Sequence, residues 1–191
     1  MQIINTNFND VKLIKKELFI DDRGYFTEVY HQKKIIEKIC KNIDFVQENE
    51  SCSKKNTIRG LHYQIYPFAQ TKLINIMSGG ILDVIVDLRK NSPTFLKHIK
   101  LIVRAEDNMQ LFIPRGFAHG FIALEDFTKV TYMVDNFYNP MSERGILYSD
   151  PQLKIDWGID DSEILISNKD RCLPTLEHVR DFFEYDIDYY G

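Results

Sequence analysis

The middle of the chain consists of short, strongly hydrophobic runs that alternate with turn residues. The runs are TKLINIM (71–77), ILDVIVDL (81–88), LKHIKLIV (96–103), MQLFIP (109–114), HGFIAL (119–124) and KVTYMVDNFY (129–138). Runs of this length, rich in β-branched and aromatic residues and separated by turns such as SGG, are typical of β-strands. Their close succession predicts strands that pair in an antiparallel sheet.

Helical periodicity is limited to two short segments outside this region. The segment from Gln32 to Lys41 places its isoleucines and Cys40 on one side, and a second segment runs from Leu176 to Phe183. The turn spacing and an aromatic content of 13% favour a closed or two-sheet architecture over a parallel α/β fold. We expect an all-β jelly-roll sandwich or barrel with a few short peripheral helices.

A chain of 191 residues is long enough to bury the core of one domain. We expect a single domain over residues 1–191, with its core up to about residue 175 and a C-terminal extension over about 176–191. The last residues, EYDIDYYG, are acidic and aromatic, and their position and composition are typical of a loosely attached end.

Charge and cysteine content narrow the possible partners. The net charge is −4, and basic and acidic residues are interspersed, so the composition indicates neither a nucleic-acid nor a membrane partner. The cysteines, Cys40, Cys52 and Cys172, are odd in number and lack CxxC spacing, which favours reduced thiols in a cytoplasmic protein. The N-terminal residues lack the basic start and apolar stretch of a signal peptide, and no apolar run is long enough to span a membrane.

Two polar clusters interrupt the strand pattern. NTIRGLHYQ (56–64) contains Arg59, His62 and Gln64, and IPRGFAHGF (113–121) contains His119 in a PxGxxH pattern. The pair resembles the two motifs of the cupin superfamily, whose histidines meet inside a β-barrel. Metal-dependent cupins supply an HxH pair and a glutamate from the first motif, but here Gln64 takes the place of the second histidine and no carboxylate follows. Because only two histidines remain as ligands, we expect no metal.

A longer series of motifs resembles the dTDP-4-dehydrorhamnose 3,5-epimerase family of nucleotide-sugar epimerases. The motifs occur in order over nearly the whole chain: DDRGYFTE (21–28), QENESCS (47–53), IRGLHYQ (58–64), QTKL (70–73), DVIVDLR (83–89), SPTF (92–95), QLFIPRGFAHGF (110–121), YNPMSERGI (138–146) and ISNKD (166–170). The resemblance implies an isomerase without a cofactor that inverts carbon 3, carbon 5 or both in a nucleotide-linked 4-keto-6-deoxy sugar. Such an enzyme supplies deoxysugars for surface polysaccharide.

This chemistry needs a base, an acid on the opposite face of the sugar and a group that stabilises the enolate between them. By motif position, the resemblance makes His62 the base and Asp170 the carboxylate that orients it. It likewise makes Tyr132 the acid and Lys72 the cation near the enolate oxygen. No metal or redox cofactor is required for these steps.

The resemblance also implies which residues bind the rest of the substrate. Arg23 and Arg59 match contacts to the diphosphate, which a planar guanidinium can bind through two oxygens at once. His119 and Tyr138 match further residues of the pocket.

Phe26, Glu28 and Gln47 match the part of the pocket that holds the nucleoside. In the family, the N-terminal segment with the motif from Arg23 to Glu28 reaches the barrel of the neighbouring subunit. The resemblance therefore implies a homodimer with shared sites.

Taken by themselves, these residues also allow structural interpretations. Lys72 could be a solvated charge at a sheet edge, Asp170 a turn or helix-cap residue, and Arg59 part of an ion pair. Asp83 and Arg89, charged residues in a strand-like run, could form a structural ion-pair network.

Several functions also remain open at this point. One is the same chemistry at a single carbon of another nucleotide sugar, such as a GDP-linked 4-keto heptose. Others are a metal-dependent cupin oxygenase and a non-catalytic sugar-binding cupin. The motifs do not determine the nucleotide, the sugar or the number of carbons inverted.

Overall fold

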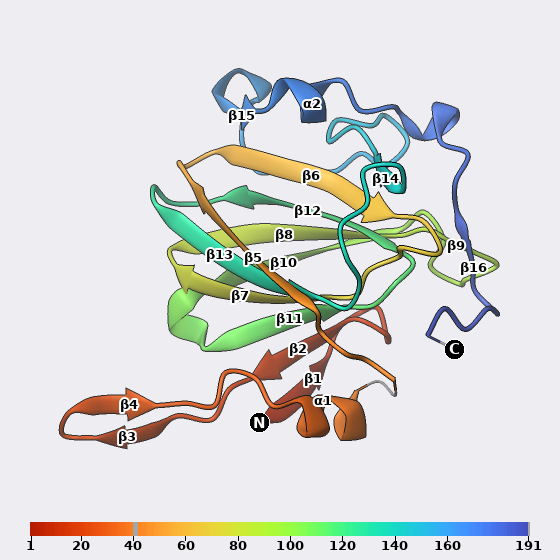
Figure 1. Cartoon of the computed structure of the whole chain (residues 1–191). Helices are drawn as coiled ribbons and strands as arrows, with labels where there is room; N and C mark the ends of the chain where they lie inside the picture. Colours follow the sequence, from red (N-terminus) through yellow and green to blue (C-terminus); the bar gives the residue numbers. More distant parts are fainter. Residues whose placement is uncertain (40–41, 191) are drawn as a thin grey trace.

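Two β-sheets face each other in the computed structural model of the chain, which describes residues 1–39 and 42–190 (Figure 1). The first sheet has the order β1-β2-β11-β7-β13-β5, formed by β1 (Gln2–Asn5), β2 (Lys12–Lys15), β11 (Met109–Ile113), β7 (Lys72–Ser78), β13 (Thr128–Val134) and β5 (Gln47–Ser53). The second has the order β10-β8-β12-β6-β14, formed by β10 (His98–Arg104), β8 (Gly80–Asp87), β12 (Phe117–Ala123), β6 (Thr57–Gln64) and β14 (Glu143–Gly145). A further strand, β15 (Leu165–Ile166), pairs in parallel with β6. The prediction of an all-β jelly-roll fold is confirmed.

The remaining elements are short. A hairpin of β3 (Phe19–Asp21) and β4 (Gly24–Phe26) projects from the body, and β9 (Arg89–Lys90) pairs with β16 (Phe183–Glu184). The helices are α1 (Gln32–Lys38), α2 (Asn168–Arg171) and three 3₁₀ turns, η1 (Ala105–Asp107), η2 (Asp161–Glu163) and η3 (Leu176–His178). In the part of the chain that the structure describes, no helix has the length and hydropathy to cross a membrane.

The helix predicted from Gln32 is present, and the prediction of a helix from Leu176 to Phe183 is wrong. α1 begins at Gln32 as expected and ends at Lys38, while Cys40 and Lys41 lie outside the described residues. The segment from 176 to 183 forms only the η3 turn and then enters β16. The reason is backbone pairing, because the Phe183 N–H donates to the Leu88 carbonyl and so ties the segment to β9. A short isolated helix cannot compete with such tertiary contacts.

The C-terminal residues are not loosely attached, contrary to the prediction. The Tyr189 side chain packs against the core cluster on the outer face of the second sheet. Tyr190 packs against a third cluster, which contains Leu73 and Phe112. Aromatic side chains therefore hold the acidic segment against the body of the protein.

Alternation along the strands of the second sheet separates two hydrophobic layers. In β8, Ile81 and Ile85 belong to the cluster between the two sheets, whereas Val84 and Val86 belong to the cluster on the outer face. The segment from 146 to 183 covers the outer cluster. The inward positions of β8 also include Asp83, so a fully buried carboxylate faces the space between the sheets.

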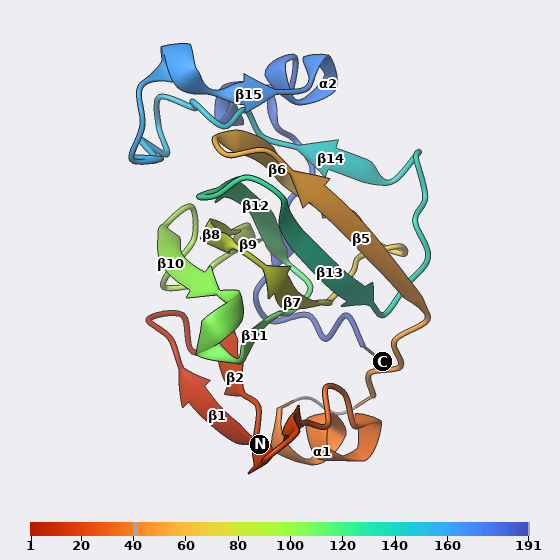
Figure 2. The same ribbon diagram turned by 90° about the vertical axis from the view of Figure 1, so that its left-hand side faces the viewer.

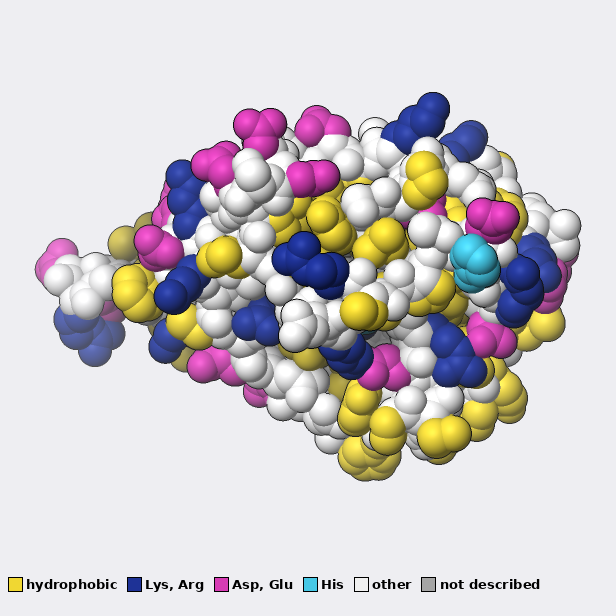
Figure 3. All heavy atoms as spheres, turned by 90° about the horizontal axis from the view of Figure 1, so that it is seen from above, with side chains coloured by type: hydrophobic (Ala, Val, Ile, Leu, Met, Phe, Trp, Pro, Cys, Tyr) yellow, Lys and Arg dark blue, Asp and Glu magenta, His cyan; other side chains and the backbone are white. Residues whose placement is uncertain are grey.

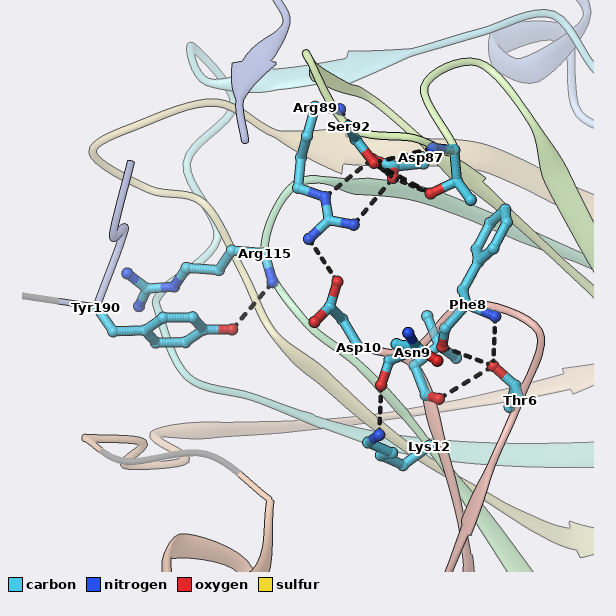
Figure 4. A network of polar contacts seen from close by, with 12 residues as sticks. Thr6, Phe8, Asn9, Asp10, Lys12, Asp87, Arg89, Ser92, Arg115 and Tyr190 are labelled. Atoms are coloured by element: carbon cyan, nitrogen blue, oxygen red, sulfur yellow. Dashed lines mark hydrogen bonds and ion pairs between the residues drawn. The ribbon is translucent and has the colours of Figure 1, made fainter. Parts of the chain in front are cut away.

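Asp87, at the end of β8, is the centre of a structural polar network (Figure 4). Its fully buried carboxylate accepts hydrogen bonds from the backbone and guanidinium of Arg89 and from the hydroxyls of Ser92 and Thr94. Burial raises the pKa of Asp87, but these donors outweigh it and hold the pKa below its usual value. Arg89 also binds Asp10 at 2.8 Å, so this arginine has a structural role.

We expect Asp87→Ala to lower the free energy of unfolding by about 3–5 kcal/mol, because it leaves the Arg89 guanidinium, whose side chain is 12% exposed, with only the partly exposed Asp10 as a charged partner. Asp10→Ala removes the other carboxylate that binds Arg89, and the Asp10 side chain is 46% exposed. This variant should therefore lose less than about 1 kcal/mol of unfolding free energy. Urea denaturation followed by circular dichroism measures both. Equal losses for the two variants would contradict the assignment of Asp87 as the centre of the network.

Candidate active site

A cavity of about 720 Å³ lies between the two sheets, beside the apolar cluster that fills the rest of the space. A volume of this size suits a small-molecule ligand. It is lined by β5, β6, β7, β12, β13 and β14 and by residues 165–170. Figure 2 shows β6 and β12 on one side of the sandwich and β13, β7 and β5 on the other.

β6 directs both Arg59 and His62 into the cavity by means of a bulge. Residues three apart on a regular strand point to opposite faces. Here, however, three steps along β6 pair with two steps along β12. Gly60 takes up the extra residue with φ +117°, and a Cβ at this position would lie 2.6 Å from Gly120 Cα. The glycine of the IRGLH motif therefore decides where the histidine points.

His62 and Asp170 form a dyad. The His62 Nε2 lies 2.8 Å from Asp170 Oδ1, and the other carboxylate oxygen accepts the Gly60 N–H at 3.3 Å. Burial raises the pKa of Asp170, but the hydrogen bond and charge of His62 outweigh it and lower the pKa overall. Asp170 is buried and lies in α2, where its N–H donates to the Ser167 hydroxyl. It is thus more than a cap residue, since its side chain orients the histidine.

Lys72 opens β7, which lies between β11 and β13 and is not an edge strand. Its ammonium donates to the His62 carbonyl at 3.3 Å. Burial lowers the pKa of Lys72 to about 8, opposed by the charges of Asp83 and Glu143. The interpretation as a solvated edge charge is therefore wrong.

His119 faces His62 across the β6–β12 pairing and binds Asp83. Its Nε2 lies 2.7 Å from the fully buried Asp83 carboxylate. Burial lowers the pKa of His119, with Asp83 opposing the shift. Among residues 1–39 and 42–190, no three His, Cys, Asp or Glu side chains form a group that could hold a metal ion.

Tyr132 enters the cavity from β13, in the sheet opposite His62. Burial raises the pKa of its phenol; Arg59 lowers it and Glu143 adds to the increase. The phenol therefore keeps its proton at neutral pH and can donate it. The imidazole of His62 and the phenol of Tyr132 thus approach the cavity from facing sheets.

Several charged and polar groups surround the dyad. Arg59 donates to the Ser53 hydroxyl and to a backbone carbonyl, and these neutral partners do not balance its charge. Tyr138 donates to Glu143 at 2.9 Å, and Lys169 binds the same carboxylate at 2.6 Å. Glu143 and Lys169 lie in the YNPMSERGI and ISNKD motifs, but sequence reasoning assigned them no role.

Four predicted binding residues do not line this cavity in their own chain. Arg23 and Phe26 lie on the β3–β4 hairpin, where Arg23 pairs with Asp21 at 2.6 Å and Phe26 is 69% exposed. Figure 3 shows this hairpin extending away from the body of the protein. Glu28 follows the hairpin and binds a nearby lysine. Gln47 accepts the Tyr138 N–H, so it touches the cavity wall indirectly.

Comparisons with known proteins point to one family over nearly the whole chain. A family model described as dTDP-4-dehydrorhamnose 3,5-epimerase matches residues 5–178. A relative with that name from Shigella flexneri is 45% identical over 170 residues, covering 89% of this chain and 93% of the relative.

Solved structures give the same result. The dTDP-4-dehydrorhamnose 3,5-epimerase of Bacillus anthracis str. Ames, with TDP and PPi bound, is 47% identical with a TM-score of 0.86 and covers 92% of this chain and 99% of its own. The dTDP-6-deoxy-D-glucose-3,5-epimerase of Legionella pneumophila Philadelphia 1, in complex with dTDP-4-keto-L-rhamnose, is 37% identical with a TM-score of 0.92 and covers 97% and 99%.

We expect Lys72→Met to stabilise the protein by about 2–3 kcal/mol at pH 7, because it removes a charge that burial disfavours. Between pH 8 and 10.5 the unfolded lysine binds a proton that the folded lysine has lost, so the stability of the wild type rises with pH in this window. The advantage of the variant should therefore be complete below pH 8 and shrink towards pH 10.5. Urea denaturation of both proteins at several pH values measures it, and a difference that does not change with pH would contradict the lowered pKa.

Proposed function

Because the chain belongs to the dTDP-4-dehydrorhamnose 3,5-epimerase family, we propose that it inverts carbon 3, carbon 5 or both in a dTDP-linked 4-keto-6-deoxy sugar through an enolate. Membership confirms the predicted enzyme class, an isomerase of deoxysugar biosynthesis. The alternatives of a metal-dependent oxygenase and a non-catalytic sugar-binding protein are set aside by it. The observation that carries the mechanism is that the His62–Asp170 dyad and Tyr132 line one cavity from facing sheets.

His62 supplies the base. Asp170 binds its Nε2, so Nδ1 is the nitrogen that takes the proton from the carbon next to the sugar carbonyl. The lowered pKa keeps Asp170 ionised, and its charge stabilises the imidazolium that forms.

Lys72 stabilises the enolate. Its ammonium lies 3.3 Å from the His62 carbonyl in the wall of the cavity, so it is available to the sugar carbonyl oxygen, which gains negative charge as the base removes the proton. The pKa of about 8 leaves Lys72 mostly charged at neutral pH and also able to donate a proton.

Tyr132 completes the inversion by giving a proton to the opposite face of the same carbon. Its location on β13, across the cavity from β6, supports this role. Arg59, whose hydrogen-bond partners are neutral, offers positive charge at the same cavity, which suits the diphosphate of a nucleotide sugar.

Incubation with a dTDP-linked 4-keto-6-deoxy sugar in deuterated water, followed by NMR, tests this mechanism. The wild type should place deuterium at carbon 3, carbon 5 or both, and deuterium at one carbon only would identify a single-carbon epimerase. His62→Ala should reduce exchange at least about 10³-fold, whereas Tyr132→Phe should still exchange but lose inversion by at least about 10²-fold.

The control for the loss of a histidine is His178→Ala, which removes an exposed imidazole bound to Thr175. It should leave exchange unchanged. Wild-type exchange in His62→Ala would exclude His62 as the base, and no exchange by the wild type with dTDP-linked and GDP-linked 4-keto sugars would exclude the function itself.

The proposal includes a homodimer in which the β3–β4 hairpin of one subunit completes the cavity of the other. The hairpin carries apolar side chains into solvent, with Phe19 55%, Ile20 78% and Phe26 69% exposed. A two-stranded hairpin of this kind is marginally stable alone, and such a surface is typical of an interface. Arg23 on the hairpin would then reach the diphosphate in the neighbouring subunit.

Complementation tests the shared site. In a mixed dimer of His62→Ala and Arg23→Ala chains, one site combines both defects and the other has neither. Co-expression should therefore give about a quarter of wild-type activity at low substrate concentration, although each variant alone is nearly inactive. No gain on co-expression, or sedimentation at the mass of one 22.5 kDa chain, would contradict the shared dimer.

The proposal places the enzyme in the cytoplasm. Cys52 and Cys172 are both exposed and free of disulfides, as expected in a reducing compartment.

A further inference from the structure

The C-terminal segment 181–190 lies along the connection between β6 and β7. This connection, residues 65–71, lies between the strand of His62 and the strand of Lys72. It joins the two sheets at the end of the sandwich near which the C-terminal residues lie (Figure 1). The proposed mechanism does not use the segment.

The segment binds the end of β6 and the first part of the connection. The hydroxyl of Tyr63, the residue after His62, donates to the Asp181 carbonyl at 2.9 Å. Further along, the rings of Tyr66 and Tyr189 contact each other with their centroids 6.2 Å apart.

The segment binds the connection again at its end, through Tyr190. The Tyr190 hydroxyl accepts the Arg115 N–H at 3.1 Å (Figure 4) and shares a hydrogen bond with the Thr71 hydroxyl 2.8 Å away. The Arg115 guanidinium lies over the Tyr190 ring, 4.9 Å from its centroid, and also donates to the Tyr189 carbonyl. Thr71 is fully buried and directly precedes Lys72.

A buried carboxylate extends these contacts to the strand that carries Tyr132. Asp135 follows β13, and its carboxylate, 1% exposed, accepts the Thr71 N–H at 2.6 Å and the Arg115 Nε at 3.2 Å. Immediately beside it, Val134 of β13 pairs with Lys72 of β7. The contacts of Tyr190 therefore lie at the end of the ladder that joins the two strands.

We propose that segment 181–190 is a strap that positions the catalytic strands, and that Tyr190 is a positioning residue acting on Lys72 through Thr71. The inference rests on the function proposed above for Lys72. Within the described residues, the Lys72 ammonium donates a hydrogen bond only to the His62 carbonyl. The position of the ammonium therefore depends on the position of the Lys72 backbone. A small displacement of Thr71 moves the ammonium away from the enolate oxygen, and such misplacement is costly to the rate.

Kinetics of Tyr190→Phe test the strap. The variant keeps the ring and loses the hydroxyl, so kcat should fall about tenfold while KM changes less than about twofold, because Lys72 acts on charge that develops only after substrate binds. The matched control is Tyr189→Phe, whose hydroxyl accepts the Glu184 N–H within the segment, at 2.9 Å. It should keep the kcat of the wild type.

Substitution of the partner residue gives a second, independent test. Thr71→Val should lower kcat as much as Tyr190→Phe, Thr71→Ser should keep the wild-type kcat, and the double variant should lose no more than either single one. A Tyr190→Phe variant with kcat within about twofold of the wild type, or losses that multiply in the double variant, would overturn the proposal.

Hydrogen exchange separates failure of the strap from failure of the proposed function. The amides of residues 72–74 should exchange faster in Tyr190→Phe than in Tyr189→Phe, whether or not the chain has the proposed activity. Unchanged amide exchange of residues 72–74 would exclude the strap but not the proposed function. If the wild type incorporates no deuterium into the substrate, the epimerase function is excluded, and the strap then has no catalytic role.

Discussion

The carboxylate of Asp170 holds together the parts of the molecule that make the site. One oxygen accepts the Gly60 amide at the bulge, and the other binds His62. The same carboxylate therefore binds the backbone of the bulge, which turns Arg59 and His62 to one side, and orients the His62 ring. Ser167 at the start of α2 and the parallel pairing of β15 with β6 hold this carboxylate above the strand (Figure 1).

The space between the sheets contains two kinds of buried charge. Asp87 accepts hydrogen bonds from several donors, and the Arg89 guanidinium donates to two carboxylates, so this network stabilises the fold. In the cavity, by contrast, burial lowers the pKa values of Lys72 and His119, because their polar partners do not fully replace water. The fold thus gives up stability in the cavity, and in Lys72 it gains an amine whose pKa of about 8 lies close to neutral pH.

Local hydrophobic patterns predicted β7, β8, β10, β11, β12 and β13 well, because each of these strands is rich in apolar and β-branched residues. They could not predict the side that His62 faces, since Gly60 breaks the alternation of β6. Nor could spacing pair His62 with Asp170, which follows it by 108 residues; only the resemblance to a family suggested this dyad. Glu143 and Lys169 were missed because their contact, too, exists only in three dimensions. The helix expected at 176–183 failed for the same reason, as its backbone pairs with a distant strand.

β6 is paired along both edges only in the finished chain. β12 covers one edge, while β14 and β15 cover the other, and these last two strands come from residues beyond 142. During synthesis from the N-terminus, the strand with the histidine therefore keeps an open edge until most of the protein has been made. An unpaired edge can recruit strands of other chains. The same late part of the chain that brings Asp170 to His62 thus also closes the open edge of β6.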